Sequence, residues 1–127
     1  PSEGLNKPAG GQGSAVSLTD PNIIDMWGIP KSDSGAIILG IADHLEWGNK
    51  TLQAEHLLAL QRKINGYIAF IESGEIYNKI PAALGKSLVI RVYGKYEVSE
   101  QGELFFERVA ELLRKMGIGF EFVFKAD

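Results

Sequence analysis

Two short apolar runs open the patterned part of the chain, at residues 22–29 (NIIDMWGI) and 36–43 (AIILGIAD). Both are rich in β-branched residues, and the turn-forming segment KSDSG separates them, which predicts a β-hairpin. The second run is apolar at consecutive positions, as in a central strand that is buried on both faces. Pro21 and Pro30 limit the first run, because proline cannot donate to a strand ladder.

A helical period follows between residues 49 and 73. Asn49 or Thr51 can accept hydrogen bonds from the N–H groups of the first turn, and Gly74 is well placed to close the helix. Apolar residues recur at spacings of three and four, which predicts one buried stripe. The stripe consists of Leu57, Leu60, Ile64, Ile68 and Ile71.

Segment 75–86 is predicted to be a connection, which Ile76, Tyr77 and Ile80 hold against the core. Residues 87–96 form the next predicted strand, and its alternate side chains lie on opposite faces. One face carries Leu88, Ile90 and Val92, and the other carries Val89, Arg91, Tyr93 and Lys95.

A second helix is predicted to begin after Ser99, its N-cap, and to end at Gly117. A final strand is predicted at 119–125, where phenylalanines alternate with other residues and are expected to face the helices. The buried stripe of the helix is predicted to be Phe105, Val109, Leu112 and Met116, flanked by Phe106 and Leu113, and the strand phenylalanines are Phe120, Phe122 and Phe124.

The resulting element order is ββαβαβ. Each strand–helix–strand unit is most simply a right-handed parallel crossover. The sequence therefore predicts an α+β fold: a four-stranded mixed sheet with two helices packed on one face. The order of the strands stays open at this point.

The composition is that of one folded domain. Hydrophobic residues make up 45% of the chain and charged residues 23%, and 127 residues are too few for two separate cores. We expect residues 1–16, rich in Gly, Pro and Ser, to be a flexible tail or an expression remnant, and 17–127 to be a single α+β domain.

Several classes of protein are disfavoured by the same composition. The net charge of −3 gives no support to nucleic-acid binding. Cysteine is absent, which excludes disulfides and thiolate catalysis and suits a cytoplasmic protein. No apolar run approaches the roughly 18 residues of a membrane span. No GxSxG, P-loop or Rossmann pattern occurs in a fitting context, so the sequence favours a protein that is not an enzyme.

Titratable residues gather in the stretch 41–56 (IADHLEWGNKTLQAEH), between a central strand and the first helix. The carboxyl end of such a strand is where open α/β sheets often bind ligands. Imidazole and carboxylate groups together indicate a divalent-metal or acid–base site. The candidate ligand-binding residues are Asp43, His44, Glu46, Trp47 and His56.

The same stretch has a structural interpretation. A strand-to-helix corner collects polar residues because its backbone groups need hydrogen-bond partners. His56 follows His44 by twelve residues, which matches no HExxH-type ligand pattern, so neither a metal nor another cofactor is predicted. Leu45 and Trp47 are expected to seal the gap between strand and helix.

The sheet face opposite the helices is the second candidate. It mixes aromatic, aliphatic and charged residues, which indicates a protein interface, most simply that of a homodimer. The alternative is a solvated face that carries a cross-strand Arg91–Glu121 ion pair. The interface candidates are Trp27, Arg91, Tyr93, Lys95 and Val123.

The segments SLTDPNIIDMWGIP, ILGIADHLEW, EHLLALQRKINGYIAFIESGEIY and LVIRVYGKY resemble a family of small bacterial proteins. That family is classed as a domain of unknown function, and the resemblance covers residues 17–125. Such chains are also similar to the products of mobile (integron) gene cassettes. The resemblance implies an accessory protein and brings no activity, catalytic residue or cofactor.

The sequence thus predicts a non-catalytic binding module, comparable to an immunity or adaptor protein in its role and acting as a homodimer. Its partner would be another protein or a small ligand, with no nucleic acid and no membrane involved. The competing hypothesis is a small hydrolase or metal-binding protein that uses Asp43, His44, Glu46 and His56.

Overall fold

The predicted hairpin is present in the computed structural model, which describes residues 24–125. Strand β1 (Met26–Gly28) pairs antiparallel with β2 (Ala36–Asp43). The first strand is shorter than the predicted 22–29, of which 22 and 23 lie outside the described residues. Just before β1, a carboxylate oxygen of Asp25 accepts the Ala42 N–H at 3.0 Å. A side chain thus replaces the backbone partner there, and Pro30 cannot extend the ladder at the other end.

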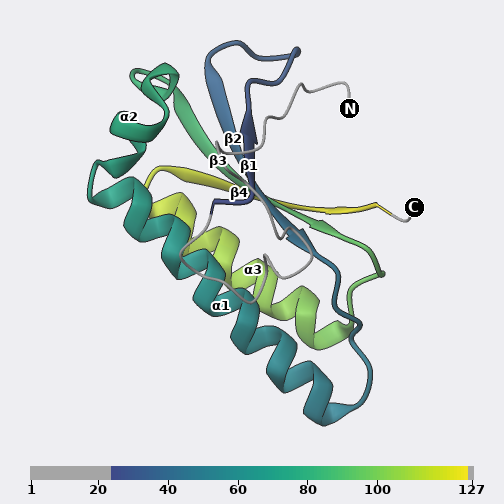
Figure 1. Cartoon of the computed structure of the whole chain (residues 1–127). Coiled ribbons are helices and arrows are strands. Elements are labelled where there is room, and N and C mark those ends of the chain that lie inside the picture. Colours follow the sequence, from purple (N-terminus) through teal and green to yellow (C-terminus); the bar gives the residue numbers. More distant parts are fainter. Residues whose placement is uncertain (1–23, 126–127) are drawn as a thin grey trace.

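The rest of the sheet is parallel. Strand β3 (Ser87–Gly94) pairs with β2, and β4 (Ile118–Phe124) pairs with β3. Helix α1 (Lys50–Glu72) connects β2 to β3, and α3 (Glu100–Lys115) connects β3 to β4. Both helices cover the same face of the sheet (Figure 1). The predicted α+β fold is confirmed. The strand order, which the sequence did not determine, is β1-β2-β3-β4.

The predicted connection after α1 contains a short helix α2 (Glu75–Lys79) and a 3-10 turn η2 (Pro81–Ala83). Ile76 and Ile80 are buried as predicted, whereas Tyr77 is exposed. Across residues 24–125, no helix combines the length and apolarity that crossing a membrane requires.

Side chains cap both long helices. The Asn49 side chain accepts the Leu52 N–H at 3.0 Å, so Asn49 rather than Thr51 starts α1. Ser99 accepts the Gly102 N–H at 3.1 Å at the start of α3. Gly74 follows α1 with a φ of +83°, a conformation that glycine adopts without strain.

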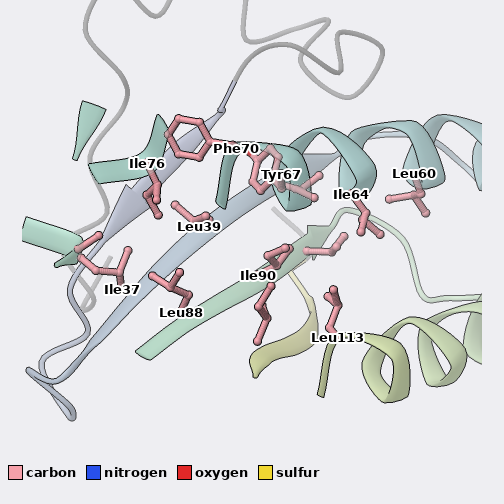
Figure 2. Close-up of a cluster of buried hydrophobic side chains, with 14 of the residues drawn as sticks. Ile37, Leu39, Leu60, Ile64, Tyr67, Phe70, Ile76, Leu88, Ile90 and Leu113 are labelled. Carbon is pink, nitrogen blue, oxygen red and sulfur yellow. The ribbon is translucent and has the colours of Figure 1, made fainter. Parts of the chain in front are cut away.

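The core lies between the sheet and the helices. Side chains of β2 and β3 meet those of α1 in the cluster of Figure 2. On β4, the ring of Phe122 stacks on Phe106 of α3 at 4.9 Å between centroids, and Phe120 lies 5.6 Å from Phe106. Phe124, at the end of the strand, is 46% exposed instead of covered.

Both helices are rotated relative to the predicted stripes. Leu112 of α3 is 56% exposed, although it was expected in the core, while the expected flanking residues Phe106 and Leu113 are buried. On α1, Leu60 and Ile64 are buried as predicted, but Leu57, Ile68 and Ile71 are only half-buried. The buried face of α1 consists of His56, Leu60, Lys63, Ile64, Tyr67 and Phe70.

Candidate functional site

The two ends of the stretch 41–56 meet in a buried pair of titratable side chains. Nε2 of His56 lies 2.7 and 2.8 Å from the two carboxylate oxygens of Asp43, and the side chains are 1% and 2% exposed. Asp43 ends β2, and His56 lies in the second turn of α1. The pair therefore ties the end of the central strand to the first helix.

Both ring nitrogens of His56 face acceptors. Nδ1 lies 3.2 Å from the carbonyl oxygen of Glu46, while Nε2 faces the Asp43 carboxylate, so each nitrogen can donate a hydrogen. Oδ1 of Asp43 also accepts the Leu45 N–H at 3.1 Å, an Asx turn that closes the strand end. Both ring nitrogens are consequently engaged by groups of the protein itself.

Trp47 closes the corner from the side of α3. Its ring stacks on His56 at 3.8 Å between centroids and meets Phe106 edge-on at 6.3 Å. Gly102 of α3 allows this approach, because a Cβ there would lie 2.8 Å from the Trp47 ring. Trp47 seals the gap as predicted, whereas Leu45 is exposed and does not.

The predicted set of four titratable residues is divided by the fold. His44 and Glu46 are exposed, and Glu46 enters the corner only through its carbonyl oxygen. Among the residues described, no three His, Cys, Asp or Glu side chains lie close enough together to hold a metal ion. The structure thus brings together Asp43, Trp47 and His56.

A second buried pair lies further along α1, between Lys63 and Asp25. Nζ of Lys63 lies 2.8 Å from a carboxylate oxygen of Asp25, and the side chains are 0% and 4% exposed. This pair was not predicted from the sequence, because only apolar residues were counted in the stripe of α1. A usable signal was the spacing of His56, Leu60, Lys63, Tyr67 and Phe70, which places them on one helical face.

Tyr67 joins this second pair to the sheet. Its hydroxyl donates to the Gly40 carbonyl oxygen at 2.5 Å and accepts the Asp25 N–H at 2.8 Å. Burial, and secondarily the negative charge of Asp25, raise the pKa of Tyr67. Because the protonated form is favoured, the hydroxyl remains a neutral donor to β2.

The face of the sheet away from the helices carries a polar cluster. Nε of Arg91 lies 2.6 Å from a carboxylate oxygen of Glu121, the cross-strand pair that the alternative interpretation of a solvated face expected. Nη1 of Arg91 also donates to the Tyr93 hydroxyl at 3.2 Å. Val123 is half-buried on this face, while Lys95 follows β3 and is exposed.

Trp27 does not belong to that face, contrary to the prediction. It lies directly opposite Leu39 in the β1–β2 pair, and opposed residues project to the same side of a sheet. Leu39 is in the core beneath the helices, and Trp27 packs against that core. Met26 instead covers the other face, because a Cβ on Gly40 would lie 2.6 Å from its side chain.

An open groove runs between the outer sides of α1 and α3. Its volume is about 220 Å³. Phe105 and Val109 are half-buried in it, and Leu112 is the most exposed apolar member. The groove therefore contains Phe105, Val109 and Leu112 of the α3 stripe that was predicted to be core, but not Met116. Its lining residues are Gln61, Ile64, Asn65, Ile68, Phe105, Arg108, Val109, Leu112 and Leu113.

Residues 16–126 match the model of a family of unknown function, DUF6572. The chain belongs to that family. The match includes every strand and helix described above, which confirms the expected domain of unknown function. No curated protein and no solved structure matches this DUF6572 chain. The geometry therefore has to carry any argument about what this member of DUF6572 does.

Proposed function

We propose that this DUF6572 chain is a non-catalytic binding module that acts as a homodimer and holds a protein partner. Its role would be that of an accessory protein, neutralising or tethering the partner as immunity and adaptor proteins do. The observation that carries the proposal is the apolar groove between α1 and α3, in a fold that encloses its charged pairs.

The dimensions of the groove favour a protein partner over a small ligand. Its volume of about 220 Å³ is below the roughly 300–1,000 Å³ of typical ligand pockets. Leu112 and Val109 contribute apolar surface to the groove, and Gln61, Asn65 and Arg108 contribute polar groups. Protein–protein interfaces combine apolar and polar side chains in this way.

The corner at the end of β2 gives the competing hypothesis less support. Asp43 and His56 bind each other in a buried pair, so a substrate would reach them only after the corner opened. His44 and Glu46 are exposed and stand apart from that pair. A hydrolase or metal-binding function would need these four groups to converge.

Site-specific photocrosslinking in the native host tests the proposal. A photoreactive residue at Leu112 should yield one dominant heterologous adduct, because this side chain lies in the groove. Tyr77 is the matched control, since it is also an exposed apolar residue but does not line the groove. Val109→Glu should abolish the Leu112 adduct by placing a charge inside the contact.

Equal crosslinking at Leu112 and Tyr77, or no protein adduct at Leu112, would contradict the assignment of the groove. An adduct that persists at full yield in Val109→Glu would also contradict it. The circular dichroism spectrum of each variant should match that of the unmodified chain, so that a lost adduct reports on contact and not on unfolding.

A further inference from the structure

The two edges of the sheet are protected very differently. At the β1 edge the strand has three residues, the Asp25 carboxylate takes the place of a ladder partner, and Pro30 follows. At the β4 edge the strand has seven residues and pairs with β3 in unbroken register from Ile118 to Phe124. Proteins usually blunt exposed edges with short strands, proline, bulges or charged side chains. β4 is long and has neither proline nor a bulge, and its charged side chains are Glu121 and, directly after the strand, Lys125.

The outward hydrogen-bonding groups of β4 can be assigned from the ladder. The Lys125 N–H donates to the Gly94 carbonyl oxygen at 2.8 Å, toward β3. Because backbone groups alternate along a strand, odd-numbered residues turn toward β3 and Phe120, Phe122 and Phe124 turn their N–H and C=O groups outward. Within residues 24–125, no further strand pairs with this edge.

We propose that a second copy of this chain pairs antiparallel with β4, with the two-fold axis at Val123. The two sheets then form one continuous eight-stranded sheet. This inference rests on the homodimer of the proposed function and names the surface that forms it. The surface differs from the α1–α3 groove, which stays open for the partner.

Charge complementarity selects this register. With the axis at Val123, Glu121 lies opposite the partner's Lys125, and the symmetry repeats this pair. An axis at Glu121 would place two carboxylates opposite each other, which is unfavourable across a ladder. An axis at Phe122 would leave Glu121 opposite the partner's Val123, with no opposite charge. Within one chain Glu121 already pairs with Arg91. Among these three axes, only the Val123 axis also places opposite charges against each other across the two chains.

Apolar contacts support the same arrangement. On the helix-facing side, Phe122 lies opposite the partner's Phe124, and aromatic cross-strand pairs are among the favourable ones. Phe124 is 46% exposed in the single chain, so this pairing covers apolar surface that the chain itself leaves open. On the other side, Val123 meets the partner's Val123 at the axis.

A charge-exchange experiment tests the register. In Glu121→Lys the introduced lysine would oppose the partner's Lys125, and in Lys125→Glu two glutamates would oppose each other. Each variant alone should therefore dimerise at least about tenfold more weakly than the wild type at low salt. An equimolar mixture should form a heterodimer in which one pair joins the two unchanged residues and the other joins the two introduced ones.

Both cross-strand pairs of that heterodimer join a glutamate to a lysine. The unchanged Glu121 of the Lys125→Glu chain faces the unchanged Lys125 of the other chain, and the introduced glutamate faces the introduced lysine, so both pairs are complementary. The mixture should therefore bind more tightly than either variant alone, while the loss of the Arg91–Glu121 contact in the Glu121→Lys chain keeps its affinity below that of the wild type. Sedimentation velocity and native mass spectrometry measure these species.

Phe124→Pro provides a second, uncharged test. Proline removes an outward N–H while leaving the bonds from β4 to β3 in place, so it should give a folded monomer. Phe124→Ala, which keeps the N–H, should retain more dimer than the proline variant. Far-ultraviolet circular dichroism verifies that both variants are folded.

The possible outcomes separate the two proposals. A wild-type chain that stays monomeric up to millimolar concentration overturns both the β4 pairing and the homodimer. A wild-type dimer whose affinity is unchanged in both charge variants, or whose mixed variants do not recover, overturns the β4 pairing alone. Partner capture at Leu112 is read independently of either result.

Discussion

The inner face of α1 buries titratable side chains among its apolar ones, whereas the groove that α1 shares with α3 leaves apolar side chains exposed. The inner face buries His56 and Lys63, each in contact with a carboxylate. The groove exposes Leu112 and part of Val109. The comparison teaches that in this fold side chains able to do chemistry are buried against one another, while some apolar side chains stay exposed in the groove that we propose for the partner.

The energetics of the two regions differ accordingly. Removing two charges from water costs about as much free energy as their attraction in the interior gains. A buried ion pair is therefore stable only where further hydrogen bonds satisfy its charged groups. Asp43 also accepts the Leu45 N–H, and Asp25 also accepts the Ala42 N–H. Removing one partner should therefore be costly, whereas a change in the groove should leave stability nearly unchanged.

Lys63→Ala should have the largest effect on stability. It leaves the Asp25 carboxylate buried without its ammonium partner, and the free energy of unfolding should fall by about 3–5 kcal/mol. Urea denaturation followed by circular dichroism measures the loss. The double variant Asp25→Asn with Lys63→Met should recover much of it, because both charges are then removed. A loss below about 1 kcal/mol for Lys63→Ala would show that the pair is not buried as described.

Asp43→Asn tests how much the contact between Asp43 and His56 contributes to stability. It weakens the contact with Nε2 of His56 and should lower the free energy of unfolding by about 2 kcal/mol. His44→Gln is the matched control, since His44 is exposed in the same stretch, and should change stability by less than about 0.5 kcal/mol. Equal losses in the two variants would argue against a special role for the Asp43–His56 pair.

Gly102→Ala tests how closely Trp47 approaches α3. The new Cβ would lie 2.8 Å from the Trp47 ring and 2.4 Å from a Val98 methyl carbon. We expect a loss of about 1–2 kcal/mol from overpacking, together with a change in tryptophan fluorescence. Gln101→Ala, one residue earlier and exposed, should show neither change. A stabilised Gly102→Ala variant would contradict the close packing.

Leu112→Asp should have the smallest effect on stability and a large effect on binding. Leu112 is 56% exposed, so the free energy of unfolding should change by less than about 0.5 kcal/mol. Capture of the partner through the groove should nevertheless be lost. A strong loss of stability would place Leu112 in the core, as the periodicity of the sequence alone suggests.

Local signals were sufficient to predict the fold. Asn49, Ser99 and Gly74 mark helix ends through contacts within a few residues, and these predictions are confirmed. The rotation of the helices could not be predicted in this way. Hydrophobicity counts Lys63 as polar, yet the residue is buried because Asp25 lies 38 positions earlier in the chain and reaches it only in the folded state.

The candidate site was predicted only in part, because local sequence brings some of its residues together and the fold determines the rest. Asp43, Trp47 and His56 lie within one strand-to-helix connection, so their meeting could be anticipated from the elements. The exclusion of His44 follows from strand alternation at the end of β2, where neighbouring side chains project to opposite sides. Trp27 was placed on the wrong face because the register of β1 on β2 cannot be derived from its short sequence.

Hydrogen exchange at the histidine rings tests the central claim most directly. Nuclear magnetic resonance of the imidazole N–H groups should show slow exchange of a His56 ring hydrogen with water, because the ring is buried, its Nε2 lies against the buried Asp43 carboxylate and Trp47 stacks on it. The ring hydrogens of exposed His44 should exchange too fast to be seen. If His56 exchanged as fast as His44, the corner would be open to solvent, and its residues would again be candidates for a site.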